Sequence, residues 1–373
     1  MATENGTERG KEWPVEARTW RDERTGRTIR QVTTYPSQSH HPFFFVPAYD
    51  RACQRLFFVS HRTGRPQVFF EELASGRLVQ TTDCDDLAEW SLSPALDGSA
   101  IYYVAGTGAY RLDLTTFEER QLAHFGTAEI RAEGMVGAAM GTTALSASGR
   151  YWAIPVKTGA VTRFVMVDTE RGTSNVFLER GEIGHPQFCP DDEDLILYAG
   201  PMTDRIWVTD RSGCGNRRLY ARESKEQWVT HESWLPGRRS VLFVDWPHGM
   251  RVVDVATGEA PWITRFPAWH AAADDAGSRI VCDTMNPDIG LHVLPVAETD
   301  ASDPQFLHAS AASSVGEHWK GPFPYNNGSI KVYAPQHTHP HPRFSPDGRR
   351  IVFTSDRTGE AQVYEVLLDA DGD

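Results

Sequence analysis

The chain has 373 residues and a net charge of -13, from 37 lysines and arginines against 50 acidic residues. This balance gives no basic footprint for nucleic acid or for an anionic membrane surface, and no apolar run approaches the ~18 residues of a membrane span. The polar N-terminus has no apolar segment of a signal peptide, and the five cysteines form no Cys-x-x-Cys pair. We therefore expect neither disulfides nor a thiolate zinc site, and the composition predicts a soluble, cytoplasmic protein.

Residues 1–20 are predicted to be a flexible segment, and residues 21–373 a single domain built from one recurring β unit. Each unit has an apolar strand, a Pro/Asp/Gly turn, a second apolar strand and a third strand. The clearest copy contains the turn Ser345-Pro346-Asp347-Gly348. The turns lie 40 to 51 residues apart, except for a last gap of 71 residues, and are anchored at Asp50, Gly98, Gly149, Asp192, Gly237, Gly277 and Gly348.

Seven all-β units of about 45 residues predict a seven-bladed β-propeller. A strand over 28–34 is expected to complete the last blade, and the long last gap is expected to hold an insertion at about 295–335, a loop or cap over one face. Two β-sandwiches are the alternative, and they account less well for the regular spacing. Third strands are expected at 110–114, 164–168, 206–210, 251–255 and 291–294.

Histidines recur just before these turns, where the innermost strand of each blade begins at one mouth of the central channel. Half of the 14 histidines occupy this position: His40, His41, His185, His231, His270, His339 and His341. The apolar core of a strand gives no reason for imidazole there, so the pattern indicates a functional ring of histidines. The structural alternative is a water-filled channel lined by histidines whose hydrogen bonds are all made.

The segment from Gln336 to Pro342 predicts part of a metal site. Prolines favour an extended backbone, which would place His339 and His341 on one side with Cα atoms roughly 6.6 Å apart. With His270 from the adjacent blade and the amide oxygen of Gln336, they would hold a divalent ion and leave positions open for substrate and water. Such ligands suit Mn²⁺, Fe²⁺, Zn²⁺ or Ni²⁺ and do not choose among them. A stiff, solvated surface loop is the alternative.

From about Thr28 to the C-terminus the chain resembles the oligogalacturonate lyases. The resemblance is carried by Gly184-His185-Pro186, Thr230-His231-Glu232, His270 and the segment 336–342. It implies a seven-bladed propeller that cleaves short oligogalacturonides by metal-dependent β-elimination to 4,5-unsaturated products. It also implies Mn²⁺ held by His270, Gln336, His339 and His341, a base at His231 and an assisting arginine at Arg205.

An anionic sugar needs local positive or donor groups in so acidic a protein, and we expect Arg163, His185 and His40 to contact it. Ordinary polar lining accounts for these three residues equally well. Two other functions stay open: a lyase for another uronate-containing glycan, and a non-catalytic scaffold similar to the TolB-type propellers, whose repeat resembles residues 345–359. The metal, the length of the substrate, the exolytic or endolytic action and the oligomeric state are not determined by the sequence.

Overall fold

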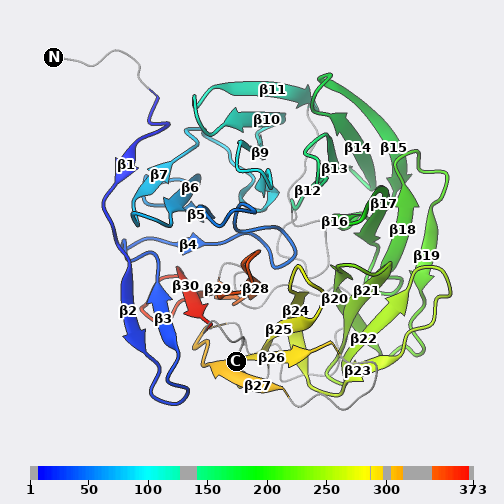
Figure 1. The fold of residues 1–373 in the computed structure, drawn as a ribbon. Helices are drawn as coiled ribbons and strands as arrows, with labels where there is room; N and C mark the ends of the chain where they lie inside the picture. Colours follow the sequence, from blue (N-terminus) through cyan, green and yellow to red (C-terminus); the bar gives the residue numbers. More distant parts are fainter. Residues whose placement is uncertain (1–6, 127–140, 286, 297–303, 314–337, 369–373) are drawn as a thin grey trace.

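The computed structural model describes residues 7–126, 141–285, 287–296, 304–313 and 338–368. In these parts of the chain the strands form seven antiparallel sheets around one central axis, and the sequence runs once around the ring (Figure 1). The predicted all-β, seven-bladed propeller is therefore confirmed. No helix in the described residues is long and apolar enough to cross a membrane.

The two strands nearest the axis in each blade are joined by the recurring turn. The innermost strands are β4 (Ser39–His40), β8 (Ser93–Pro94), β12 (Ala144–Leu145), β16 (Gly184–Cys189), β20 (Trp228–Leu235), β24 (Ala268–Ala273) and β28 (Arg343–Phe344). The second strands are β5 (Arg55–Ser60), β9 (Ala100–Ala105), β13 (Tyr151–Thr158), β17 (Asp192–Ala199), β21 (Ser240–Trp246), β25 (Arg279–Thr284) and β29 (Arg350–Ser355).

The third and outer strands complete each sheet. The five predicted third strands are confirmed: their C-terminal ends agree to within one residue, and they begin at the predicted residue or up to three residues before it. The third strands are β6 (Gln67–Glu72), β10 (Gly108–Asp113), β14 (Val161–Asp168), β18 (Ile206–Asp210), β22 (Gly249–Asp254), β26 (Leu291–Pro295) and β30 (Gln362–Leu367). The outer strands are β7 (Leu78–Gln80), β11 (Glu119–His124), β15 (Thr173–Arg180), β19 (Arg217–Tyr220), β23 (Trp262–Thr264), β27 (Gln305–His308) and β3 (Thr28–Gln31). A 3₁₀ turn, η1 (Glu89–Ser91), precedes the second blade.

The recurring turn is defined by one backbone hydrogen bond and a left-handed glycine. The amide of Gly348 donates to the carbonyl of Ser345, and the amide of Gly98 donates to that of Ala95, at 2.9 and 3.0 Å. The φ angles of these glycines are 67° and 72°, a conformation that a Cβ disfavours. The glycines in the sequence pattern therefore mark real turns.

The first and last strands of the propeller close the ring. β3 pairs with β30, with Thr28 opposite Leu367 and Gln31 opposite Tyr364, so the expected closing strand is present over its first four residues. From β3, Arg30 donates from Nη1 to Glu71 of the first blade at 2.8 Å and to Glu365 of the seventh at 2.7 Å. Both carboxylates are buried, so ion pairs as well as backbone hydrogen bonds between β3 and β30 close the ring.

Two strands lie in or overlap the described part of the segment 1–20 that we predicted to be flexible. β1 (Glu12–Trp13) adds a fifth strand to the first blade, and β2 (Arg18–Arg21) adds a fifth to the seventh. The ring of Trp13 packs edge-on against Phe69 at 6.2 Å between centroids, and Arg62 pairs with Glu16 at 2.7 Å. Polar composition is misleading here because outer edge strands need little apolar surface.

One strand of the propeller lies within the range of about 295–335 where we predicted an insertion. β27 (Gln305–His308) lies inside that range but is the outer strand of the sixth blade, paired with β26. Gln305 and Phe306 are exposed or half-buried, whereas Leu307 and His308 are buried, a weak apolar signal for a strand. Residues 297–303 and 314–335 lie outside the described residues.

Apolar side chains between neighbouring blades form the core. Trp228 and Leu242 of the fifth blade pack with Cys282 of the sixth, and Val281 of the sixth packs with Ile351 of the seventh. Because each blade is covered on both faces, its middle strands are continuously apolar. The mouths of the channel are left for polar residues.

Candidate metal centre and active site

Local irregularities in the innermost strands turn the histidines toward the channel. The strand pairing shifts register between Gly184 and Gln187 in β16, and between Thr230 and Ser233 in β20. Inside these bulges His185 and His231 have φ angles of 46° and 52°, and His341 before β28 has 47°. Such angles are uncommon for residues other than glycine, and they cluster at functional sites.

Three of the four predicted metal ligands meet. The candidate ligand atoms of His270, His339 and His341 all lie within 4.8 Å of one another, and the three side chains are 1 to 2% exposed. The ring centroids of His270 and His341 are 4.2 Å apart, and those of His270 and His339 are 5.7 Å apart. Gln336 lies outside the described residues, so its part in the site stays a prediction.

The three imidazoles are suited to hold a cation. Burial, together with the neighbouring imidazoles, lowers the pKa of His270 and of His341 well below 6.5, so both are neutral and keep a lone pair. Among the described residues, the buried Nε2 of His341 has no hydrogen-bond partner. A cluster of neutral nitrogen donors fits Mn²⁺ or another divalent transition metal.

Behind His270 lies a carboxylate that sequence reasoning missed. Asp283 on β25 accepts from the ring Nδ1 of His270 at 2.7 Å and from its backbone amide at 2.6 Å. Burial raises the pKa of Asp283 to about 8, although the backbone amides of His270 and His341 oppose that shift. Its position in a plain apolar strand, Ile280-Val281-Cys282-Asp283, was the available signal.

His231 stands beside the metal cluster. Its ring centroid is 4.2 Å from that of His270, and its Nδ1 donates to the carbonyl oxygen of Trp269. Because a carbonyl only accepts, the hydrogen sits on Nδ1 and Nε2 carries the lone pair. Burial and the neighbouring His270 lower the pKa of His231 well below 6.5, which leaves it unprotonated at neutral pH.

Arg205 is held by an acidic residue that sequence reasoning did not assign. Its Nε and Nη2 donate to the two oxygens of Glu232 at 3.0 and 3.2 Å, and Nη2 also lies 2.9 Å from Nδ1 of His185. All three side chains are buried. Burial alone would raise the pKa of Glu232, but Arg205 and His185 lower it to about 2. Glu232 was visible in the sequence as the residue directly after His231.

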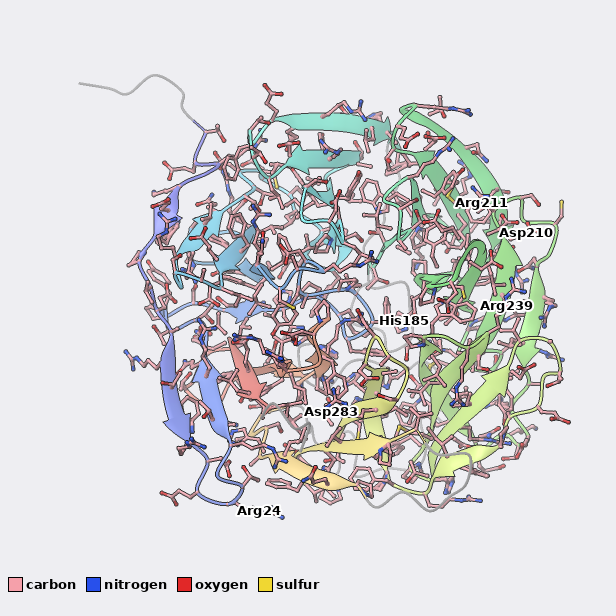
Figure 2. All side chains as sticks on the ribbon, viewed as in Figure 1. Arg24, His185, Asp210, Arg211, Arg239 and Asp283 are labelled. Carbon is pink, nitrogen blue, oxygen red and sulfur yellow. The ribbon has the colours of Figure 1, made fainter. Side chains whose placement is uncertain are left out.

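The three predicted substrate contacts are placed differently. His185 lies near the middle of the ring (Figure 2). His40 contacts Glu89 at 3.1 Å, and its ring lies tilted against that of Trp90 with 4.3 Å between centroids. Arg163 is not part of this buried group, because it is exposed on β14 and paired with Glu179 at 2.9 Å. The contact of each with substrate stays a prediction.

A short aromatic segment after β4 lies directly against the histidines. The ring of Phe43 is 4.6 Å from that of His341 and 5.1 Å from that of His185, and the ring of Phe44 is 5.4 Å from that of His270. Arg343 donates to the carbonyl of Phe44 at 3.0 Å. These buried rings keep water from that side of the cluster, which strengthens electrostatic interactions there.

The fold and the site together define a class of protein: a closed seven-bladed propeller with a buried cluster of three histidines that could hold a metal ion. Comparisons with known proteins then give the family. A family model of oligogalacturonate lyase matches residues 7–371. The chain belongs to the oligogalacturonate lyase family.

Similar proteins span nearly the whole chain. An oligogalacturonide lyase of Pectobacterium atrosepticum is 25% identical over 95% of this chain and 97% of its own length, and an oligogalacturonate lyase of Dickeya dadantii is 24% identical with the same coverage. A solved oligogalacturonate lyase in complex with manganese has a TM-score of 0.81 at 22% identity, over 98% of this chain and 99% of that one. An oligogalacturonate lyase from Vibrio parahaemolyticus has a TM-score of 0.80 at 19% identity, over 98% of this chain and 100% of that one. At these identities the solved structures support the fold.

Proposed function

We propose that this protein is a metal-dependent lyase that cleaves short oligogalacturonides by β-elimination and leaves 4,5-unsaturated products. The observation that carries the proposal is the meeting of His270, His339 and His341 within reach of one cation, beside His231. The names of the curated relatives support the substrate class.

The proposed cofactor is Mn²⁺, held by His270, His339, His341 and Gln336. The manganese complex of a similar propeller supports this choice, and the imidazole nitrogens of this site suit Mn²⁺ as well as other divalent transition metals. When bound, a divalent cation supplies positive charge next to the carboxylate of the substrate, which makes the neighbouring C5 proton easier to remove.

His231 is the proposed base, because its Nε2 carries a lone pair. β-Elimination transfers the C5 proton to Nε2, and the electron pair of the C5–H bond becomes the second bond between C4 and C5. The C4–O4 bond breaks with its electrons on O4, and the departing oxygen is then protonated. A neutral imidazole suits this role at neutral pH.

Arg205 is proposed to add positive charge beside the sugar carboxylate. Both oxygens of Glu232 accept hydrogen bonds from the guanidinium, one from Nε and one from Nη2. These bonds fix the plane of the guanidinium, so the side chain does not have to reorganise during the reaction. His185, His40 and Arg163 are proposed to contact the anionic sugar chain, which the net charge of -13 would otherwise repel.

The test combines metal analysis with an activity screen. Purified protein is expected to contain a divalent transition metal, and removal by a chelator should lower the rate of formation of unsaturated uronide by about two orders of magnitude or more, with recovery on adding Mn²⁺. The screen compares oligogalacturonides with other uronate-containing glycans by product absorbance. Full activity in metal-free protein, or product from another uronide alone, would contradict the proposal.

A cytoplasmic location is also proposed. None of the five cysteines forms a disulfide, which suits a reducing compartment. Cell fractionation with detection of the native protein would test it, and recovery outside the cytoplasmic fraction would contradict it.

A further inference from the structure

We propose that Asp283 is a positioning residue that sets which nitrogen of His270 faces the metal, and thereby sets the affinity of the site for its cation. The inference rests on the proposed metal site and deepens it. The sequence analysis did not assign this aspartate to the site.

The position of Asp283 follows from an irregularity in the sixth blade. β24 pairs with β25 at Ala268, opposite Thr284, and again at Ala271, opposite Cys282, so the two residues between them leave the ladder. The amide of His270 therefore donates to Asp283 Oδ1 at 2.6 Å. The other oxygen, Oδ2, accepts from Nδ1 of the same residue at 2.7 Å. One carboxylate thus holds both the backbone and the ring of His270.

This arrangement determines the tautomer of His270. With a cation bound on the far side of the imidazole, Asp283 would be ionised and would only accept hydrogen bonds, so the hydrogen of the neutral imidazole stays on Nδ1 and the lone pair stays on Nε2. A carboxylate behind a ligating histidine also makes its lone pair more basic, and the loss of such a partner weakens metal binding.

Charge balance gives an independent reason to connect Asp283 with a cation. Asp283 is buried, and among the described residues its side-chain partner is the neutral imidazole of His270 rather than an arginine or lysine. By contrast, the buried Glu232 is paired with Arg205, and the buried Glu365 with Arg30. A buried carboxylate without a charged partner is costly, and a cation on the other side of the imidazole would offset that cost.

The variant Asp283→Asn separates this role from a purely structural one. It has nearly the same shape, and its amide oxygen still accepts from the backbone of His270. Its amide nitrogen would face Nδ1 of the ring as a donor, which favours the tautomer with the hydrogen on Nε2. The metal-facing nitrogen would then lose its lone pair.

The experiment titrates Mn²⁺ calorimetrically into the metal-stripped full-length chain. Asp283→Asn is expected to weaken Mn²⁺ affinity by about 10- to 100-fold, while the melting temperature of the metal-free protein stays at or above that of the wild type. Asp283→Glu keeps a carboxylate and is expected to bind more tightly than Asp283→Asn. In a His270→Ala background, Asp283→Asn should cause little further loss, because the aspartate acts through that ring.

The matched control is Asp274→Asn in the same blade. Asp274 is also a buried aspartate, but its oxygens accept from Ser278 and Arg279 of its own turn. This variant should lower the melting temperature without changing Mn²⁺ affinity. Equal Mn²⁺ affinity in Asp283→Asn and wild type would overturn the inference alone, whereas a wild type that binds no Mn²⁺ would overturn it together with the proposed cofactor.

Discussion

At the scale of single residues, the partner of one ring nitrogen decides what the other nitrogen can do. In His231, Nδ1 faces a carbonyl, and in His270 it faces the carboxyl group of Asp283. Nε2 therefore carries the lone pair in His231 and, when Asp283 is ionised, in His270 as well. In His185 the shortest contact of Nδ1 is the guanidinium donor of Arg205 at 2.9 Å, so its hydrogen belongs on Nε2. The neighbours of these three buried imidazoles thus differ in the way that the proposed roles of His231 as base and His270 as metal ligand require.

The role of His231 is testable with His231→Gln. We expect kcat to fall by about 10²- to 10⁴-fold, the usual contribution of a general base, while Mn²⁺ affinity stays nearly unchanged. Because burial lowers the pKa of His231, the wild-type rate should decline only at pH values below 6.5, where the base becomes protonated. His124→Gln, at an exposed position on β11, is the control. A fully active His231→Gln that retains its metal would require another base.

At the scale of elements, the innermost strands and the closing strand have different roles. Bulges in β16, β20 and β24 interrupt the strand pairing at the histidines. The local loss of regular pairing orients the histidine side chains. The closing strand β3 instead pairs regularly with β30. There, stability depends on Arg30 lying between two buried carboxylates.

Replacing that arginine should weaken the closed ring. Arg30→Met leaves Glu71 and Glu365 buried without their shared partner, and breaking a buried ion pair costs about 3–5 kcal/mol. Arg77→Met is the control, because Arg77 has a 48% exposed side chain in its ion pairs with Glu12 and Glu72, and such surface pairs contribute little. Urea unfolding should show a much lower midpoint for Arg30→Met. Equal midpoints in the two variants would rule out the electrostatic closure.

At the scale of the whole molecule, the channel concentrates histidines that are neutral in the fold. Burial lowers the pKa of His41 to about 4 and also lowers the pKa of His185, His231, His270 and His341. The unfolded chain binds protons at these residues below pH 6.5, whereas the native protein does not. Their contribution to stability is therefore present above pH 6.5 and is lost as the pH falls.

The metal-free protein should accordingly be less stable at pH 5.5 than at pH 7.5. Each buried histidine contributes up to about 1.4 kcal/mol per pH unit below its unfolded pKa. The free energy of unfolding in urea at the two pH values measures the effect, and His41→Gln should reduce the pH dependence by the share of one proton. An unchanged or higher stability at pH 5.5 would contradict this account.

Much of the fold could be predicted because a propeller is a repeat. Left-handed glycines such as Gly98 and Gly348 punctuate the chain at nearly regular intervals, and these signals are local. We did not predict strands in the N-terminal segment, because β1 and β2 are edge strands that are held in place by residues distant in the sequence. Phe69, which packs against Trp13, is one of them. The candidate ligands His270, His339 and His341 could be predicted because each lies at the same position relative to the recurring turn.

By itself, the sequence determined the number of blades, the place of the closing strand and the histidines at the channel mouth, because repeats and turns depend on residues that are close together in the chain. Only the tertiary structure decided that Asp283 stands behind His270, that Glu232 grips Arg205 and that Phe43 and Phe44 lie against the imidazoles. The physical reason is that hydrogen bonds and ring contacts act over a few ångströms in space. Those contacts join residues that no spacing along the chain relates.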